Sequence, residues 1–181
     1  IERWRKEGMP PGVPYEDYFD LDKFASIGAD VSPRYPARTL EDTSDYTVST
    51  TSFGVTFKNW KKWGGVPEFL DFTVKDPASW KAAKARMAPD RDRVDWASLK
   101  GNYGKWREQG RWISAQFWFG FDVTHSWFVG TERVLTAMAE EPEWLVDIFN
   151  HMLGLDMALF GMVWDAGYRF DEIMWLSLIH I

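Results

Sequence analysis

The chain has 181 residues, of which 45% are hydrophobic and 27% charged, and its formal net charge is −6. This composition is typical of a folded protein, and the acidic balance argues against a general nucleic-acid surface. Because the chain has no cysteine, it can form neither a disulfide nor a cysteine-ligated zinc site, and it has no thiolate nucleophile.

Aromatic and charged residues are unevenly used. Aromatic residues make up 17% of the chain, and 12 of them are tryptophan. Residues 1–121 carry 19 basic and 17 acidic side chains, whereas residues 122–181 carry 2 basic and 10 acidic ones. The excess of tryptophan calls for a large core or for a surface on which ligands stack.

The first part of the chain predicts an irregular wrap followed by a small sheet. Five prolines within residues 8–45 prevent long regular structure, apart from a short helix near residues 15–24. We expect Tyr18, Phe19 and Phe24 to anchor this wrap. β-branched and aromatic residues around the turn at Gly54 predict a hairpin over residues 46–60, with residues 69–74 as a third strand.

Two helices are predicted next. Asp76 followed by Pro77 is a typical helix start, because aspartate caps free amides and proline is tolerated in the first turn. A second helix is expected to begin at Asp95, although Gly101 and Gly104 each destabilise it by about 1 kcal/mol relative to alanine. The second helix therefore needs support from tertiary packing.

From residue 111 onward the pattern predicts a βαβ unit. Trp112–Trp118 is typical of a buried strand, residues 131–139 and 142–166 are helical, and Phe170–Trp175 is the next strand. Because the connection between these two strands is so long, we expect them to pair in parallel, with a right-handed crossover. Two parallel strands need cover on both faces, which indicates a part of a larger α/β protein.

The order of these features resembles that of the uroporphyrinogen decarboxylase superfamily, particularly its bacterial uroporphyrinogen decarboxylase-like members. Each matching segment is short, and the resemblance depends on their shared order along nearly the whole chain. The segments are ERWRKEGMP (residues 2–10), YEDYF (15–19), GVTFKNW (54–60), PEFLDFTVKDPASW (67–80), FGFDVTHSWFVGTE (119–132) and VWDAGYRFDEIMW (163–175).

The resemblance implies an α/β fold, a partial (β/α)8 TIM barrel with an N-terminal extension of helices and a β-hairpin. A whole barrel needs about 250 residues, so the chain would supply only part of one. Residues 1–110 would form the N-terminal wrap, hairpin and helices, and residues 111–175 the first βαβ unit. Residues 176–181 replace an expected acidic loop and resemble a non-native tail, which suggests a truncated fragment that is inactive alone.

The resemblance also implies two reactions. Family members either decarboxylate acetate side chains of uroporphyrinogen without a cofactor, or use zinc to move methyl groups between corrinoid proteins and thiols. The arginine-rich entry motif of true porphyrinogen decarboxylases is missing here, and both reactions stay open. We expect no cofactor within this chain, and zinc with a corrinoid partner only in a full-length methyltransferase.

The segment Phe119–Gly130 follows a predicted strand, where active-site loops of barrel enzymes lie. Asp122 and His125 are its candidate catalytic residues, because histidine exchanges protons near neutral pH. Trp118 and Trp127 are candidate substrate-binding surfaces. The alternative is structural: Asp122 caps a turn, His125 is a hydrogen-bonded loop residue and the tryptophans fill the core.

Other polar residues are interpreted as structural. Asp165, Asp171 and Glu172, with Asp156 nearby, form an acidic group that favours stability or solubility over metal binding. His151 is expected to face solvent or a partner. The three histidines have no metal-binding spacing, so no metal site is predicted, and the glycines match no nucleotide-binding motif.

These inferences predict part of a cytoplasmic uroporphyrinogen decarboxylase-like enzyme that acts on a tetrapyrrole-like or small acidic substrate. The alternative is a non-enzymatic, aromatic-lined binding module, for example for carbohydrate. Nucleic acid is not expected as a partner, although Lys58, Lys61 and Lys62 lie near two tryptophans. A membrane is not expected either, because no run of about 18 apolar residues is present. The full-length protein is expected to form a homodimer.

Overall fold

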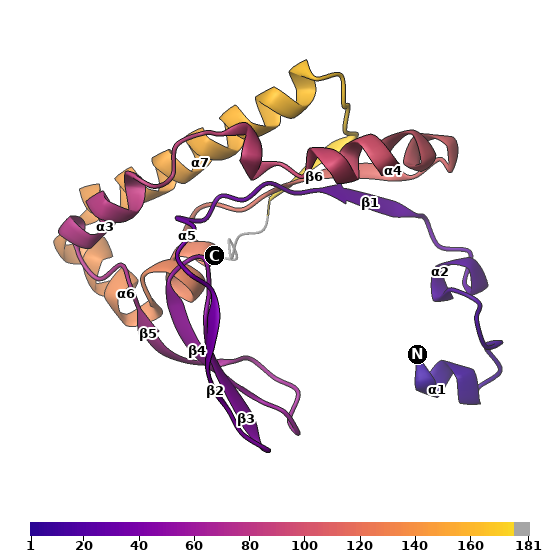
Figure 1. The fold of residues 1–181 in the computed structure, drawn as a ribbon, viewed down its shortest axis with the longest axis horizontal. Helices are drawn as coiled ribbons and strands as arrows, with labels where there is room; N and C mark the ends of the chain where they lie inside the picture. Colours follow the sequence, from indigo (N-terminus) through magenta and orange to yellow (C-terminus); the bar gives the residue numbers. More distant parts are fainter. Residues whose placement is uncertain (176–181) are drawn as a thin grey trace.

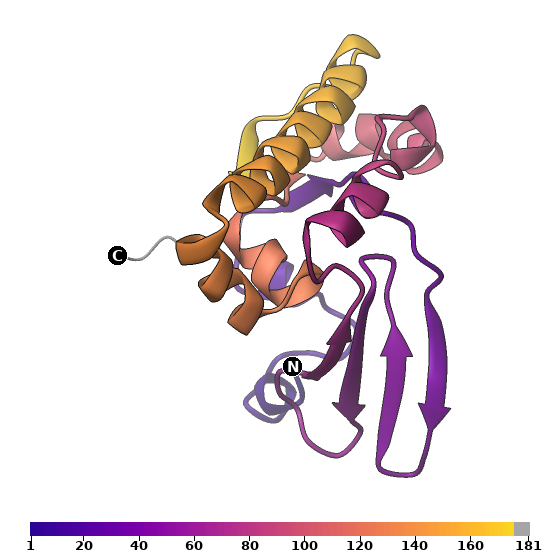
Figure 2. The ribbon, with the colours of Figure 1, turned by 90° about the vertical axis from the view of Figure 1, so that its left-hand side faces the viewer.

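Two separate sheets and a set of helices make up the protein in the computed structural model, which describes residues 1–175. The predicted tail over residues 176–181 lies outside the described residues. A parallel sheet with helices above it forms the top of an arch, and an antiparallel sheet forms one arm (Figure 1). Figure 2 shows the four strands of that arm side by side, projecting away from the helices.

The expected partial (β/α)8 barrel is wrong for the part of the chain that the structure describes. Strands β1 (Phe24–Ile27), β6 (Trp112–Phe117) and β7 (Glu172–Trp175) form an open sheet in the order β1-β6-β7. The other four strands pair antiparallel in a sheet of their own. Both β1 and β7 are edge strands, so the parallel sheet does not close. The barrel was implied by the family resemblance. Alternating strands and helices predict parallel pairing equally for open and closed sheets, so the sequence pattern could not distinguish the two.

The parallel pairing of β6 with β7 is confirmed, with Ser114 opposite Glu172 and Phe117 opposite Trp175. Strand β1 was not predicted, although it pairs in parallel with the other side of β6. Helices cover one face of this sheet, where Phe117 stacks on Phe160 with ring centroids 4.7 Å apart. The carboxyl ends of β6 and β7 therefore lie together at one edge of the sheet.

The antiparallel sheet confirms the predicted hairpin and third strand and adds a fourth. Its order is β2-β3-β4-β5, and neighbouring strands follow one another along the chain. Gly54 lies in the tight β3–β4 turn at φ +90°, and a Cβ there would lie 2.7 Å from the Thr73 hydroxyl. Glycine is therefore required at this turn. The strands are β2 (Arg38–Asp42), β3 (Tyr46–Thr50), β4 (Val55–Trp60) and β5 (Glu68–Phe72).

Both predicted helices between the two sheets are confirmed. Helix α3 (Pro77–Lys84) begins with a reciprocal capping box between Asp76 and Ser79, and Asp95 caps α4 (Trp96–Glu108) by accepting from the Ser98 amide. The chain from β6 to β7 contains α5 (Phe121–Val123), the π-helical turn η2 (Thr124–Phe128), α6 (Thr131–Glu140) and α7 (Pro142–Asp165), and a 3-10 turn, η1 (Arg91–Arg93), precedes α4.

Helix α7 is the main cover of the parallel sheet. Its inner face contributes Ile148, Met152, Leu159 and Val163, all of them fully buried. Within residues 1–175 it is also the one helix whose length and composition would allow it to cross a membrane, with 39% of its most apolar window buried. Core helices meet the same criteria, and α7 packs on the sheet as one does.

The N-terminal segment forms two short helices, α1 (Glu2–Lys6) and α2 (Tyr15–Tyr18). The predicted anchors Tyr18 and Phe19 are 43% and 44% exposed, and Phe24 is 57% exposed. Their role as anchors is therefore wrong. Aromatic contacts within the segment hold it together instead, such as Trp4 with Phe19 at 5.2 Å.

Candidate functional site at the end of strand β6

The segment that follows β6 is more ordered than the loop that the sequence predicts. It folds into α5 and η2, and Gly120 and Gly130 flank these turns at φ +88° and +95°. Gly130 passes close to the antiparallel sheet, because a Cβ on it would lie 2.8 Å from the Phe72 ring. Single π-helical turns occur frequently at functional sites.

Asp122 and His125 lie one helical turn apart in this segment. The Asp122 Oδ1 atom is 3.8 Å from His125 Nε2, and the two side chains are 19% and 18% exposed. The imidazole also lies 3.1 Å from the Thr131 hydroxyl through Nδ1, and 3.0 Å from the Ser126 hydroxyl through Nε2. Both ring nitrogens therefore have a polar neighbour, as a proton-transferring histidine requires.

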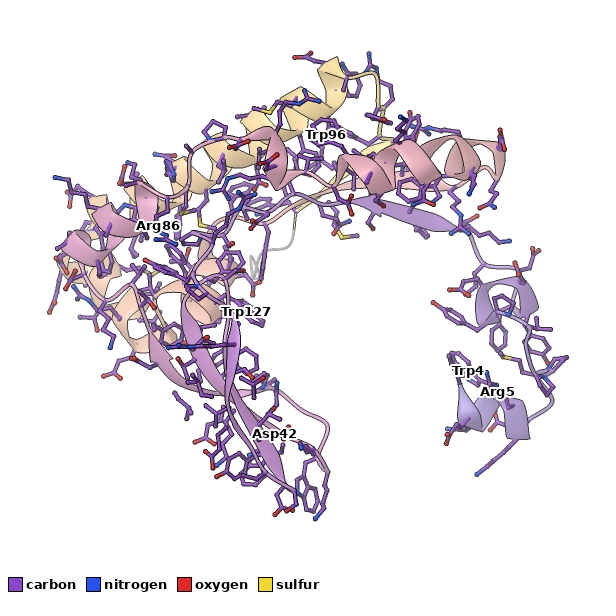
Figure 3. All side chains as sticks on the ribbon, viewed as in Figure 1. Trp4, Arg5, Asp42, Arg86, Trp96 and Trp127 are labelled. Atoms are coloured by element: carbon purple, nitrogen blue, oxygen red, sulfur yellow. The ribbon has the colours of Figure 1, made fainter. Side chains whose placement is uncertain are left out.

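Trp118 and Trp127 lie beside this pair. The Trp118 indole N–H donates a long hydrogen bond of 3.5 Å to Asp122 Oδ2, and its ring meets Trp127 at 5.9 Å, tilted by 66°. Trp127 in turn contacts Phe57 and Phe69 of the antiparallel sheet. Figure 3 places Trp127 where the two sheets meet. The structure thus brings all four predicted residues into one chain of contacts, and the indoles also pack as core residues do.

Sequence reasoning missed Asp156 as part of this region. Its side chain is 1% exposed on the inner face of α7, and its Oδ2 atom accepts a hydrogen bond of 3.2 Å from the Trp118 backbone N–H. Burial raises the pKa of Asp156 to about 7. Its Oδ1 atom is buried and has no hydrogen-bond partner among the described residues. The signal was present in the sequence, because Asp156 is the only charged residue between Asp147 and Asp165 of an otherwise apolar helix.

Asp171, which the sequence analysis groups with Asp156, has a different role. Asp171 accepts two hydrogen bonds from Arg107, at 2.7 and 2.8 Å, and one of 2.7 Å from the Ile113 backbone N–H. These bonds lower the pKa of Asp171, with the guanidinium as the larger cause. Asp171 therefore ties α4 to the start of β7, which agrees with the predicted stabilising role.

His151 is half-buried, whereas the sequence predicts that it faces solvent or a partner. Its ring lies 5.6 Å from the Trp80 ring at 73°, and its Nε2 atom is buried without a described partner. Burial lowers the pKa of His151, so the neutral form is favoured in the folded protein. It is therefore a partly buried residue that packs between α3 and α7.

Five cavities in the described part of the chain are lined by residues other than the four predicted ones. One of about 500 Å³ borders the site through Gly130 and Thr131, whose hydroxyl contacts His125. Lys75 and Arg133 line it together with Asp71 and Glu132, so its wall carries two basic and two acidic side chains. A larger one, of about 620 Å³, lies between α2 and the start of β1, away from the strand ends. Of these five, the cavity of about 500 Å³ is the one lined by a residue that contacts His125.

No group of three or more His, Asp or Glu side chains within residues 1–175 is arranged to hold a metal ion. The zinc site implied by a methyltransferase is therefore not built from the described residues. Comparisons with models of known protein families, with curated proteins and with solved structures give no match. The family resemblance therefore depends on the residues of this chain alone.

Proposed function

We propose that the chain contributes an acid–base site for a small acidic substrate, of the kind used by uroporphyrinogen decarboxylase-like enzymes in the cytoplasm. The observation that carries this proposal is the line of contacts from Asp122 through His125 to Thr131, at the border of the 500 Å³ cavity. Ligands of open α/β sheets bind outside the carboxyl ends of the strands, which is where this line lies.

The residues suit decarboxylation in particular. Breaking the bond between a side-chain carbon and its carboxylate releases CO₂ and leaves an electron pair, which a protonated pyrrole accepts. Asp122 would stabilise that cationic ring, and His125 would supply the proton that the side-chain carbon needs. The ring would then lose the proton that it first took up, so that one proton is consumed for each CO₂ released. Lys75 and Arg133 in the cavity wall would attract the remaining carboxylates of the substrate. Methyl transfer is the alternative reaction, and its ligand set would have to come from outside the described residues.

The size of the cavity favours the smaller of the two expected substrates. A volume of about 500 Å³ lies within the range of small-molecule sites, and it matches one substituted pyrrole better than a whole tetrapyrrole. Lys75 is paired with Asp71 at 2.6 Å, and Arg133 with Glu141. A substrate carboxylate would compete with these partners for the two cations.

Binding of a pyrrole with acetate and propionate side chains, measured by calorimetry, tests the proposal. We expect binding by the native chain and a loss of about tenfold or more in His125→Gln, because a charge-assisted hydrogen bond is lost. The control is Trp63→Phe, in the exposed connection between β4 and β5. If neither this pyrrole nor uroporphyrinogen binds, the proposal is wrong.

The non-enzymatic binding module remains the second candidate. Trp60 and Trp63 are 44% and 74% exposed at one end of the antiparallel sheet, where a carbohydrate could stack. Oligosaccharide binding that disappears in Trp63→Phe and persists in His125→Gln would favour this reading. The parallel pairing of β6 and β7 supports the enzyme reading instead.

A further inference from the structure

Asp156 is a buried acid for which the described fold supplies too few partners. It lies on α7 between Met152 and Phe160, which are both buried, and it is itself 1% exposed. Of its two oxygens, Oδ2 accepts from the Trp118 backbone N–H and Oδ1 has no described partner. Burying a carboxyl group with so few hydrogen bonds is costly, and the cost is greater for the charged form.

No opposite charge compensates for this burial. The pKa of Asp156 is raised by desolvation and lowered only by the Trp118 N–H, with no contribution from any charged side chain. The ionisable groups on the elements around α7 are engaged elsewhere. Lys84 of α3 pairs with Asp147, Arg93 of η1 donates to four backbone carbonyls, Arg133 of α6 pairs with Glu141, His151 packs on Trp80, and Asp122 of α5 accepts from the Trp118 indole.

Trp118 links this buried acid to the candidate site. Its backbone N–H donates to Asp156, and its indole N–H donates to Asp122, which lies 3.8 Å from His125. Its ring packs against Phe53 at 5.1 Å. A carboxylate accepts a hydrogen bond about twice as strong as that accepted by a neutral carboxyl group. A change of charge on Asp156 therefore changes the strength of the hydrogen bond that holds Trp118, the first residue after β6.

We propose that Asp156 is a positioning residue of this site: by losing or gaining its proton it tightens or loosens Trp118, and through Trp118 it orients Asp122 and His125. The ionised form holds Trp118 tightly, and the protonated form releases it. The consequence for a substrate rests on the proposed function, whereas the effect on Trp118 does not. The burial of the group brings the change into the neutral pH range.

Fluorine NMR of the full chain labelled with 5-fluorotryptophan tests this proposal without any substrate. The Trp118 resonance is assigned by its loss in Trp118→Phe and followed from pH 5 to pH 9. We expect it to titrate with a midpoint near the pKa of about 7 in the native chain. The titration should disappear in Asp156→Asn and persist in Asp165→Asn, which changes an exposed acid of the same helix.

Histidine side chains in general change charge near neutral pH, so a further variant, His125→Gln, separates the two groups. A Trp118 titration that persists in His125→Gln and is lost in Asp156→Asn supports the proposal. A resonance that does not move with pH in the native chain, or that titrates unchanged in Asp156→Asn, overturns it. If Asp156→Asn does not fold, the ¹⁵N-labelled Trp118 amide of the native chain must move downfield as pH rises through 7.

Failure of this inference is distinguishable from failure of the proposed function. If the pyrrole does not bind but the Trp118 resonance titrates through Asp156, only the proposed function is wrong. If the pyrrole binds and its affinity changes with pH equally in the native chain and Asp156→Asn, only the positioning role is wrong. A pH dependence of affinity that Asp156→Asn removes supports both.

Discussion

The two sheets of this protein are built from opposite kinds of contact. The antiparallel sheet pairs strands that follow one another, and of its strand residues only Val48 and Val55 are buried. The parallel sheet pairs segments far apart in the sequence, such as Phe24 with Trp112, and most of the core lies between it and the helices and turns packed around it. The first sheet is therefore specified locally, whereas the second depends on the packing of distant segments.

Charged side chains also have different surroundings in the two regions. Ion pairs on the antiparallel sheet, such as Lys61 with Asp42, are exposed to solvent. In the parallel region Asp171 bonds both a guanidinium and a strand amide, and Asp156 is buried without a counter-ion. Exposed pairs contribute little to stability, whereas a carboxylate that also bonds a strand amide and a carboxyl group that is buried contribute more, so substitutions should have larger effects in the parallel region.

The largest effect is expected where the two regions join. The Phe128 side chain is fully buried and contacts Phe53 of the β3–β4 turn and Trp80 of α3. Phe128→Ala should lower the free energy of unfolding by about 3–5 kcal/mol, because it leaves a cavity beside the two remaining aromatic rings. Urea denaturation followed by circular dichroism measures this loss. The matched control is Leu135→Ala on the neighbouring helix, where the side chain is 53% exposed and little change is expected.

Asp156→Asn should stabilise the protein, but only at higher pH. Burial raises the pKa of Asp156 from 3.8 to about 7, so the folded state binds this proton more tightly than the unfolded state. The stabilisation of the folded state by this tighter proton binding is fully present below about pH 4, and it is lost as the pH rises through the folded pKa of about 7. The gain in Asp156→Asn at pH 8 should be on the order of 3 kcal/mol.

Urea denaturation of both proteins at pH 5 and at pH 8 measures this difference. The advantage of Asp156→Asn should grow between the two pH values, whereas Asp165→Asn should show no such growth. An equal difference at both pH values would mean that the Asp156 carboxyl group ionises in the folded protein as it does in the unfolded chain.

A smaller loss is expected from Asp171→Ala. The variant removes the hydrogen bonds to Arg107 and to the Ile113 amide, and should lower the free energy of unfolding by about 2 kcal/mol at pH 7. Since the pKa of Asp171 is lowered, its contribution is present above the unfolded pKa and is lost as the pH falls through the lower folded value. Asp171→Asn keeps an acceptor for the Ile113 amide and should lose less. Equal stability of all three proteins at pH 7 would contradict this account.

Local signals allowed most of the elements to be predicted from the sequence. The hairpin followed from β-branched residues around Gly54, and α3 from Asp76 with Pro77, because turns and caps depend on neighbouring residues. Strand β1 was missed since it has only four residues, lies within the proline-rich residues 8–45, and pairs with the distant segment Trp112–Ala115. The barrel was wrong because the closure of a sheet depends on strands that no local pattern specifies.

The candidate site likewise contains residues that are close in the sequence and one residue that tertiary packing brings to them. Trp118, Asp122, His125 and Trp127 are in contact because they lie within about three helical turns of one another. Asp156 reaches Trp118 from 38 residues further along the chain, and its burial depends on how α7 packs on β6. Sequence reasoning therefore found the members that local spacing brings together and missed the one that tertiary packing supplies.

The smallest effect should come from the exposed pair on the antiparallel sheet. Lys61 and Asp42 are 42% and 62% exposed, and Lys61 also donates to the Thr43 carbonyl oxygen. Asp42→Asn should therefore lower the free energy of unfolding by less than about 0.5 kcal/mol, and by still less at high salt. Urea denaturation at 0.05 and 1 M NaCl measures both values. A loss as large as that of Asp171→Ala would mean that ion pairing in the antiparallel sheet is as strong as in the parallel region, and the contrast between the two regions would then not hold.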